Sequence, residues 1–324
     1  MKFGIIGLGN HSVNRVMPAI QKSGNTISAI LTRRQDKGEM LAAKFGCEYY
    51  TDQDSFFEDD FDAVYIASPN SLHFNHASVS LENGRHVLLE KPMTLSSADS
   101  GRLCRMADAD NLRLCVGFHM RFHPGLQAVR QMLGKEEIGN VTMIAGSWAG
   151  LSTRTYDNPD NSWWTMPDMA GGGSVMGTGV HVLDSINYVL GQSPDYVSAS
   201  RVPAESVVDK TSLIVMRYGD IVASALSSRL VERPDNSLYV FGDEGTIEAA
   251  GIFGTEVRGK VILSGETVKT FRGGNPYLHE IEDFVSQIAG KGTAIATGED
   301  GHLVVKIVEA SFKSSREFST IRME

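Results

Sequence analysis

The sequence is poor in cysteine, in excess basic charge and in long apolar segments, and each shortage excludes a class of protein. Its 324 residues include only Cys47, Cys104 and Cys115, which are widely spaced and form no CxxC pattern. This usage fits a reducing compartment with buried, inert thiols, and it argues against a disulfide framework. No run of 18 or more apolar residues is present, so we expect no membrane span.

The charge balance argues against a nucleic-acid partner. Lysine and arginine number 30 against 39 acidic residues, which gives a formal net charge of -9, whereas phosphate binding needs a basic face. The strand pattern starts at Lys2 and leaves no room for a signal peptide, so we expect a cytoplasmic protein.

Strand patterns alternate with helix patterns over the first 120 residues. The expected strands cover residues 2–6, 26–31, 47–50, 61–67, 87–89 and 112–116. This order is typical of a doubly wound parallel sheet, so we predict a Rossmann dinucleotide-binding domain over residues 1–120.

The period changes after Ile138, where eight strand patterns follow one another with tight turns between many of them. They cover residues 141–148, 196–202, 211–218, 221–230, 237–241, 246–250, 260–263 and 267–271. We predict an open, mostly antiparallel sheet with covering helices in a second domain, residues 121–324, for substrate binding and oligomerisation. Two closing amphipathic helices are expected over residues 277–288 and 302–318, and we expect them to pack against the sheet and the first domain.

A glycine-rich turn lies between the first expected strand and a helix over residues 12–22. It matches G-x-G-x-x-G, except that Ser12 replaces the third glycine, and strand–turn–helix is the context in which this motif binds a pyrophosphate. An ordinary glycine-rich turn is the alternative. The predicted cofactor-binding residues of the turn are Gly7, Leu8, Gly9, Asn10 and His11.

The end of the second strand predicts which dinucleotide binds. Folds that prefer NAD place an acid there for the ribose 2′-hydroxyl, but this chain has Thr32, Arg33 and Arg34, with no carboxylate before Asp36. Guanidinium groups suit a 2′-phosphate, so we predict NADP over NAD. The alternative is that the two arginines only cover a solvated loop.

Polar residues also follow the fourth and fifth strands, at the edge where an open parallel sheet binds ligands. Ser68, Pro69 and Asn70 should line the cofactor cleft, and His73 should start the next helix. Lys91, which comes before a proline that could be cis, is a candidate for orienting or protonating a substrate hydroxyl. The alternative for Lys91 is a solvated side chain at a strand end.

Histidines later in the chain offer further candidates. His119 and His123 are four apart, but Pro124 opposes a helix there, so we expect no metal and place His119 at the cleft. Three glycines, residues 171–173, come before a helix over residues 174–190 and allow close backbone approach. On that helix His181 could carry a proton or belong to the core, and Asp184 could orient it or tie the helix to a neighbour.

Together these residues resemble the glucose–fructose oxidoreductase / inositol dehydrogenase family (Gfo/Idh/MocA) over essentially the whole chain. The motifs that carry the resemblance are Gly7-Leu8-Gly9, Ala67-Ser68-Pro69-Asn70 with His73, Glu90-Lys91-Pro92, Arg121 with Phe122 and Pro124, Gly171-Gly172-Gly173, and Gly179-Val180-His181 with Asp184. The resemblance implies hydride transfer between a nicotinamide and a sugar, sugar derivative or polyol. It also implies a homodimer or homotetramer formed through the open sheet.

The resemblance assigns roles to residues. Lys91 and His181 match the family's catalytic pair, and Thr32-Arg33 matches members that use NADP. The predicted cofactor set adds Ser68, Pro69, Asn70, His73, Glu90, Lys91, His119, Arg121, Trp163 and Trp164. The predicted substrate set is Lys91, His119, Asp168, His181 and Asp184.

Two departures put the usual sugar substrates of the family in question. Gly177 stands where an aspartate is usual, four residues before the histidine, and Trp163-Trp164 stands where Trp-Arg is common. The missing carboxylate has three candidate replacements on the preceding loop, namely Asp168, Tyr156 and Asp157.

The main hypothesis is therefore an NADP-dependent sugar or polyol oxidoreductase. A first alternative is a catalytically silent NAD(P)-binding regulator, which Gly177 would suit but the retained Lys91 and His181 oppose. A second is an NAD-dependent glycosidase of the same fold, which Arg33 and Arg34 make less favourable.

Overall fold

The computed structural model describes residues 1–151, 159–232, 235–292 and 295–323. The chain forms two compact units. The first contains Met1–His119 and Tyr277–His302, and the second contains Met120–Pro276 and Leu303–Glu324.

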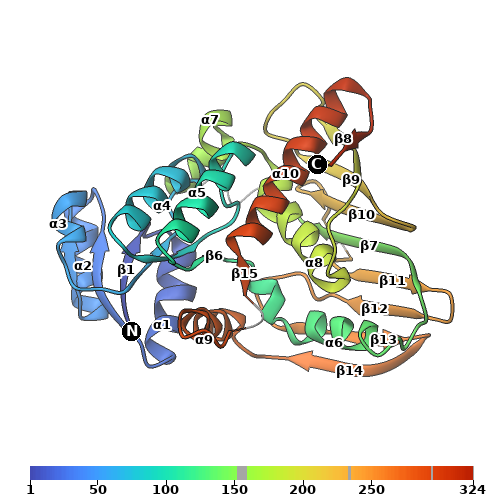
Figure 1. Cartoon of the computed structure of the whole chain (residues 1–324), viewed down its shortest axis with the longest axis horizontal. Helices are drawn as coiled ribbons and strands as arrows, with labels where there is room; N and C mark the ends of the chain where they lie inside the picture. Colours follow the sequence, from blue (N-terminus) through green and yellow to red (C-terminus); the bar gives the residue numbers. More distant parts are fainter. Residues whose placement is uncertain (152–158, 233–234, 293–294, 324) are drawn as a thin grey trace. The chain divides into compact units, whose positions relative to one another are not determined.

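The first unit is a doubly wound parallel sheet, as predicted (Figure 1). Its strands run in the order β3-β2-β1-β4-β5-β6, which is the Rossmann order, and an antiparallel strand β15 is added beside β6. The bounds are β1 Lys2–Ile6, β2 Thr26–Leu31, β3 Glu48–Tyr50, β4 Ala63–Ile66, β5 His86–Leu89, β6 Leu114–Val116 and β15 Ala296–Thr297.

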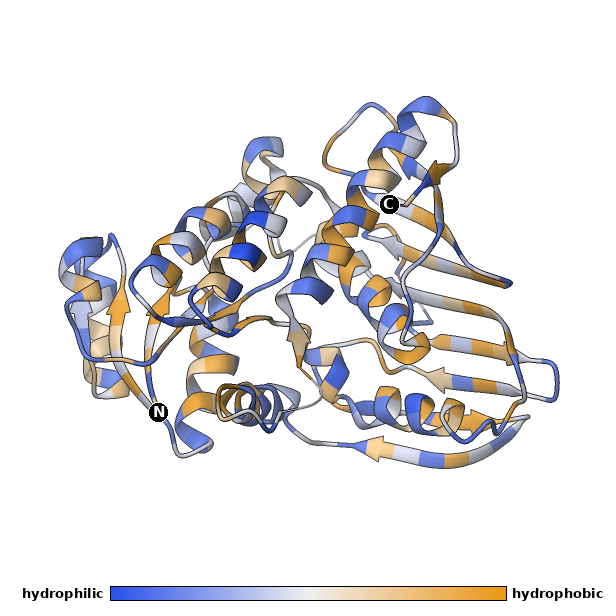
Figure 2. Ribbon diagram, viewed as in Figure 1, coloured by the Kyte–Doolittle hydropathy of each residue, from blue (hydrophilic) through white to orange (hydrophobic). Residues whose placement is uncertain are grey.

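Helices cover both faces of this sheet, so its central strands are buried and read as continuous apolar runs. The strands of this sheet are largely orange in Figure 2. The helices are α1 Met17–Lys22, which continues a π-type turn Ser12–Val16, α2 Gln35–Phe45, α3 Gln53–Phe57, α4 His73–Glu82, α5 Ser97–Ala109 and α9 Pro276–Ile288. Gly46 ends α2 in the left-handed region, as the sequence predicts.

The segment Tyr277–His302 departs from the predicted boundaries, because it packs with the first unit rather than the second. Phe284 of α9 lies with its ring 6.1 Å from that of Phe3 on β1, and both side chains are fully buried. β15 then pairs with the edge strand β6. The amphipathic pattern of α9 indicates a buried face, but it does not say which sheet that face covers.

The second unit contains a nine-stranded sheet in the order β14-β13-β12-β11-β7-β10-β9-β8-β16. It is mostly antiparallel, as predicted, with one parallel pair, β7 and β10. The strands are β7 Val141–Ala149, β8 Tyr196–Val202, β9 Thr211–Tyr218, β10 Ile221–Ser228, β11 Leu238–Gly242, β12 Thr246–Ala250, β13 Arg258–Leu263, β14 Glu266–Arg272 and β16 Ile321–Arg322. Of these, only β16, two residues long, is absent from the prediction.

One face of this sheet is covered by helices and the other is open. The covering helices are α6 Pro124–Leu133, α8 Val180–Leu190 and α10 Gly298–Glu317, and the short helix α7 Pro167–Ala170 also belongs to this unit. A Cβ on Gly146 of β7 would lie 2.6 Å from Val182, so glycine lets α8 lie close to the strand. β9 alternates buried and exposed residues along its length, the pattern of a sheet with one covered face.

The three cysteines are free thiols, as their spacing suggests. Cys104 and Cys115 are buried, whereas Cys47 is half-buried. Burial raises the pKa of Cys47 to about 11 and the pKa values of the other two to about 12, so all three stay protonated and unreactive near neutral pH. No helix in the described part of the chain is long and apolar enough to cross a membrane.

His123 is the N-cap of α6 rather than a ligand. Its Nδ1 accepts a hydrogen bond from the Gly125 N–H at 3.0 Å, and its Nε2 lies 3.1 Å from the Arg258 carbonyl oxygen. Nδ1 must therefore be unprotonated, and the proton on Nε2 donates to that carbonyl. Burial lowers the pKa of His123 to about 4, which keeps the imidazole neutral.

Acid should weaken the second unit through this cap. The folded-state pKa lies below the unfolded value of 6.5, so the stabilisation is complete above that pH and declines as pH falls toward 4. We expect the free energy of unfolding to fall between about pH 7 and pH 5 by about 2 kcal/mol more for the wild type than for His123→Asn, whose amide still caps the helix. Urea unfolding followed by circular dichroism measures this difference. Equal pH dependence in the two proteins would contradict the assignment.

Candidate active site

The glycine-rich turn after β1 has room for a ligand at one glycine and none at the other. Gly7 has φ +96°, and a Cβ there would overlap the carbonyl carbon of Ala67, just beyond β4. At Gly9 a Cβ would meet nothing within 4 Å. Ser12, in the place of the third glycine, is fully buried at the start of the helix. The first glycine is therefore required by packing and the second borders open space.

The residues after β2 do not all stay available for a phosphate. The Arg34 guanidinium binds the Asp36 carboxylate at 2.8 Å, and its hydrogen bond is the main cause of the lowered pKa of Asp36. Thr32 Oγ1 accepts a hydrogen bond from the Arg34 N–H at 3.2 Å. The side chain of Arg33 is exposed. Arg34 thus holds the first acid of this loop, and Arg33 is the better candidate for a phosphate contact.

His73 is the first residue of α4, as predicted, and it ties two loops together. Its Nε2 lies 2.9 Å from the Ser68 carbonyl oxygen and its Nδ1 lies 2.8 Å from that of Pro92, beyond β5. The ring is 1% exposed, and burial lowers its pKa. His73 was predicted to bind cofactor, but its ring is occupied in joining the carboxyl ends of β4 and β5. Pro69 precedes a short 3-10 turn, Asn70–Leu72, in which Asn70 is buried.

Glu90 is held in a buried network at the end of β5. The Tyr65 hydroxyl donates to its Oε1 at 2.9 Å, and His11 Nε2 lies 3.2 Å from the same oxygen. The Lys91 N–H donates to Oε2 at 3.3 Å. Burial alone would raise the pKa of Glu90, but the nearby charges of His11 and Lys91 and these hydrogen bonds lower it to about 2. The carboxylate therefore stays ionised and fixes the backbone that carries Lys91.

The chain after β6 passes close to the Glu90 carboxylate, because a Cβ on Gly117 would lie 3.0 Å from Glu90 Oε1. The Lys91–Pro92 bond next to Glu90 is cis, as the sequence allowed. Glu90, predicted to bind cofactor, is thus surrounded by groups of the protein itself.

Aromatic packing from α9 completes this corner of the first unit. The ring of Tyr277 lies 4.7 Å from that of His119 and 5.1 Å from that of His11. Tyr277 is 1% exposed and His119 is 5% exposed. The sequence motifs point to both histidines but not to Tyr65 or Tyr277, because nothing in an apolar strand or a distant helix marks these tyrosines as neighbours of the two histidines and Glu90.

In the second unit, His181 lies in the first turn of α8 and is 2% exposed. Its ring lies 5.0 Å from that of Trp148 on β7. Asp184, one turn later, is fully buried and binds the Arg121 guanidinium through both oxygens, the shortest contact being 2.6 Å. Of the two roles left open for Asp184, tying the helix to a neighbour is therefore the one observed. Arg121, predicted to bind cofactor, is buried in this ion pair.

The start of the same helical segment is held by Asp209, which no sequence motif marks. Its carboxylate accepts hydrogen bonds from the Gly173 N–H at 2.8 Å, the Val175 N–H at 3.0 Å and the Ser174 hydroxyl. Arg201 lies 3.6 Å away as its counter-ion. A Cβ on Gly173 would overlap the Asp209 carbonyl oxygen. The three glycines were predicted to allow close backbone approach. At Gly173 the group that comes close is the backbone of Asp209.

The remaining predicted residues lie just before this segment. Trp163 and Trp164 stack on each other, with centroids 4.3 Å apart, in the 3-10 turn Pro159–Thr165. The Arg229 guanidinium lies 5.4 Å from the Trp164 ring centroid. Asp168 is exposed in the short helix α7. Tyr156 and Asp157 lie outside the described residues.

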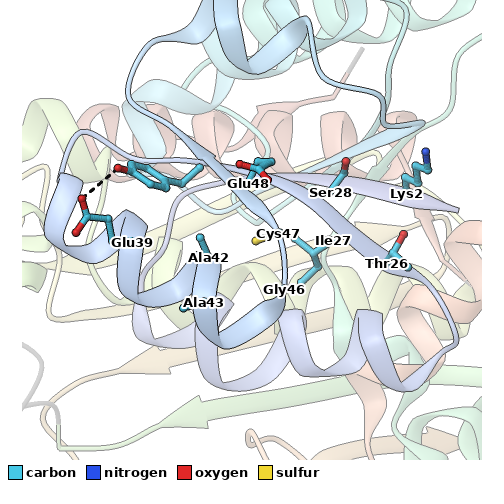
Figure 3. A pocket seen from close by; sticks show the side chains of 11 residues that line it. Lys2, Thr26, Ile27, Ser28, Glu39, Ala42, Ala43, Gly46, Cys47 and Glu48 are labelled. Carbon is cyan, nitrogen blue, oxygen red and sulfur yellow. Dashed lines mark hydrogen bonds between the residues drawn. The ribbon is translucent and has the colours of Figure 1, made fainter.

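A pocket in the first unit lies away from the glycine-rich turn, at the other end of the sheet strands (Figure 3). It is lined by residues such as Lys2, Thr26 and Glu48, which begin β1, β2 and β3, and the Tyr49 hydroxyl contacts Glu39 at its rim. Gly7 follows the opposite end of β1, about 16 Å away at the usual rise per residue. The pocket therefore has no part in the glycine turn.

The described residues contain no group of three His, Cys, Asp or Glu side chains that could hold a metal ion.

Two family models match the chain. Residues 1–118 match the model described as oxidoreductase family, NAD-binding Rossmann fold, and residues 126–248 match the GFO/IDH/MocA C-terminal domain. The chain belongs to the Gfo/Idh/MocA family of oxidoreductases. The resemblance found in the sequence is thus confirmed.

Several proteins that are similar to this chain are named as sugar oxidoreductases. The chain is 27% identical over 333 residues to D-xylose 1-dehydrogenase (NADP(+)) 2 of Haloferax volcanii, with 100% of both chains covered. Among solved structures, aldose–aldose oxidoreductase from Caulobacter crescentus, in complex with glycerol, matches with a TM-score of 0.89 at 21% identity, covering 100% of this chain and 99% of that one. The WlbA dehydrogenase of Bordetella pertussis, in complex with NADH and UDP-GlcNAcA, matches with a TM-score of 0.87 at 19% identity, covering 100% and 98%.

The glycine turn of this Gfo/Idh/MocA member fits a dinucleotide. The open space at Gly9 is where a pyrophosphate would reach the backbone N–H groups at the helix start, and a side chain would fill it. Thr32 and Arg33 stand at the end of β2, where the adenosine ribose binds in this fold.

Two alanine substitutions should separate packing from ligand binding at this turn. Gly9→Ala should leave the melting temperature of the ligand-free protein nearly unchanged, because its methyl group meets nothing, yet weaken NADPH binding roughly tenfold or more. Gly7→Ala should destabilise the fold itself, since its Cβ would overlap Ala67 and its φ is positive. Thermal melting and NADPH fluorescence titration measure the two effects. Tight NADPH binding by Gly9→Ala would show that the dinucleotide does not cross this turn.

Proposed function

We propose that this protein is an NADP-dependent oxidoreductase that transfers hydride between the nicotinamide and a sugar, sugar derivative or polyol. The observation that carries the proposal is the glycine turn, tight at Gly7 and open at Gly9, in a Rossmann sheet of this family. Relatives named as NADP(+)-dependent D-xylose dehydrogenases support both the cofactor and the substrate class.

The preference for NADP rests on the loop after β2. Arg33 is exposed there, and the nearest acid, Asp36, is bound by Arg34. A free carboxylate at this position would repel a 2′-phosphate, whereas a guanidinium binds one through paired hydrogen bonds. Arg33 and the Thr32 hydroxyl are the proposed contacts of the 2′-phosphate.

Lys91 and His181 are the proposed catalytic residues. A bound nicotinamide supplies the acceptor or donor of the hydride. In oxidation, the substrate carbon loses hydride and its hydroxyl loses a proton to His181, which leaves a carbonyl. Lys91 donates a hydrogen bond to the reacting oxygen and stabilises the negative charge that develops on it. In reduction, His181 returns the proton.

The surroundings of these two residues support their roles. Glu90, ionised and held by Tyr65 and His11, fixes the backbone of Lys91 at the end of β5. His181 lies on a helix held by Asp209 at its start and by Arg121 at Asp184. A proton carrier and a hydrogen-bond donor need such rigid placement, because small displacements cost large factors in rate.

A second copy of the chain is the proposed cover of the open sheet face. Cross-strand neighbours Leu213, Val215, Val222 and Met143 lie there, each 39% to 47% exposed. An apolar face of this kind usually marks an interaction site.

The oligomeric state tests this proposal. Light scattering should find a dimer or tetramer of the wild type at micromolar concentration and a smaller species for Leu213→Glu. A monomeric wild type would disprove the proposal.

Removing either proposed catalytic side chain should strongly reduce turnover but leave cofactor binding intact. We expect Lys91→Ala and His181→Ala each to lower kcat roughly a hundredfold or more on the best substrate, since general acid–base groups contribute that much. NADPH binding, followed by fluorescence, should change little. Wild-type kcat in both variants would disprove the assignment.

The cofactor choice has its own test. Arg33→Gln should weaken NADPH binding roughly tenfold to a hundredfold and leave NADH binding nearly unchanged, because only NADPH carries the 2′-phosphate. The matched control is Arg113→Gln, which removes an equal charge from the loop before β6. If Arg33→Gln weakened both dinucleotides equally, Arg33 would not be the 2′-phosphate ligand.

A further inference from the structure

The side chain of His11 connects the glycine turn to the buried carboxylate of Glu90. His11 is the N-cap of the π-type turn Ser12–Val16, and its side chain forms no capping hydrogen bond there. Its Nε2 lies 3.2 Å from Glu90 Oε1, and the imidazole is 39% exposed. One edge of this ring therefore meets an internal carboxylate, while another part of it is open to solvent two residues after Gly9.

The Glu90 contact decides which nitrogen of the neutral His11 ring carries the proton. The pKa of Glu90 is about 2, so its carboxylate is ionised and its oxygens only accept hydrogen bonds. Nε2 must therefore be protonated and donate to Oε1. In the neutral ring Nδ1 is then an acceptor, and no described residue forms a hydrogen bond with it. Neutral His11 presents a lone pair to a ligand, and only the imidazolium presents a second donor.

The groups that touch this ring keep a fixed charge near neutral pH. Glu90 is ionised, and the ring of Tyr277 meets that of His11 edge-on, with centroids 5.1 Å apart. Burial is the main cause that raises the pKa of Tyr277, so its hydroxyl stays neutral. A change of charge at this contact falls on the imidazole, since histidine titrates near about pH 6.5. Other ionisable groups near Glu90 and Tyr277 are Lys91, Tyr65, Glu280, His119 and Arg15.

A dinucleotide would bring two negative charges to this turn. In this fold the pyrophosphate approaches the first N–H groups of the helix, and the open space at Gly9 leaves room for it. The Glu90 side chain is only 11% exposed, so water screens its negative charge weakly. A proton on His11 Nδ1 would offset the repulsion between the carboxylate and the pyrophosphate, and it would create a charged donor for a phosphate oxygen.

From this arrangement we propose that His11 binds the pyrophosphate as an imidazolium, so that the dinucleotide takes up a proton when it binds. The inference rests on the proposed function and adds a charged side-chain contact and a dependence on pH. The same proton makes the contact with Glu90 a full ion pair. Because Glu90 Oε2 accepts the Lys91 N–H, cofactor binding thereby tightens the network that positions the proposed catalytic lysine.

Dinucleotide binding should accordingly weaken as the pH rises. A site that holds one proton when occupied and loses it when empty has a constant Kd at low pH. Above the titration of the empty site, Kd rises by up to about tenfold per pH unit. The 2′-phosphate of NADPH also titrates, near about pH 6, so NADH, which lacks this group, should be measured in parallel.

Isothermal titration calorimetry in buffers of different ionisation enthalpy counts the protons directly. At about pH 7.5 we expect the wild type to take up roughly half a proton or more per NADPH or NADH. Its Kd for either should rise roughly tenfold or more between about pH 7 and pH 8.5. His11→Gln keeps an N–H donor for Glu90 but cannot titrate, so it should take up no proton with NADH and show a nearly constant Kd.

Two further variants test the origin of the proton. Glu90→Gln removes the negative charge that favours the imidazolium, so it should reduce the uptake at the same pH. His279→Gln is the matched control. It removes an exposed histidine of the same unit that also contacts a carboxylate, that of Glu282 at 3.0 Å, and it should keep the wild-type proton count.

The outcomes separate this inference from the proposed function. Equal proton uptake by the wild type and His11→Gln would overturn the inference and leave the dinucleotide site standing. A wild type that binds neither NADPH nor NADH would overturn the proposed function and, with it, this inference. If His11→Gln fails to fold in a melting experiment, Glu90→Gln decides: reduced uptake supports the inference, and uptake equal to that of the wild type overturns it.

Discussion

The helix that carries His181 starts at a buried carboxylate, and the geometry of the second unit depends on that contact. Asp209 is fully buried, yet it accepts two backbone N–H bonds and one hydroxyl bond from residues 173–175 and faces Arg201. Burying such an ion pair costs free energy that the mutual attraction does not always recover. The main role of the contact is to position the helical segment, because the carboxylate satisfies the first backbone N–H groups of that segment and fixes its direction.

The first unit uses a carboxylate in the same way. Glu90 is ionised, buried and bound by Tyr65, His11 and the Lys91 N–H. Each unit therefore presents its proposed catalytic side chain from backbone that an anion holds in place. Residues that a motif marks as ligand-binding, namely Glu90, His73 and Arg121, are engaged with protein groups that hold the site together.

The pattern of strands and helices was readable because each local signal agreed with the fold. Buried parallel strands appear as short apolar runs, and the strands of the open sheet alternate, so both sheets and nearly all of their members were predicted. Pairing across long sequence distances left no such signal. The amphipathic pattern predicts that α9 packs on the first domain, but nothing near Pro276 indicates that its partner is β1, or that β15 extends the first sheet beyond β6.

The sequence by itself determined the family and the glycine turn, and it singled out Thr32, Arg33, Lys91 and His181 for the roles proposed above, because these depend on residue type and spacing along the chain. Only the tertiary structure decided what surrounds them. Asp209 meets Gly173 from 36 positions away, and Arg229 reaches the Gly173 carbonyl oxygen from 56 positions away and lies beside Gly177. Such neighbours are set by strand register and helix packing, which no local pattern encodes.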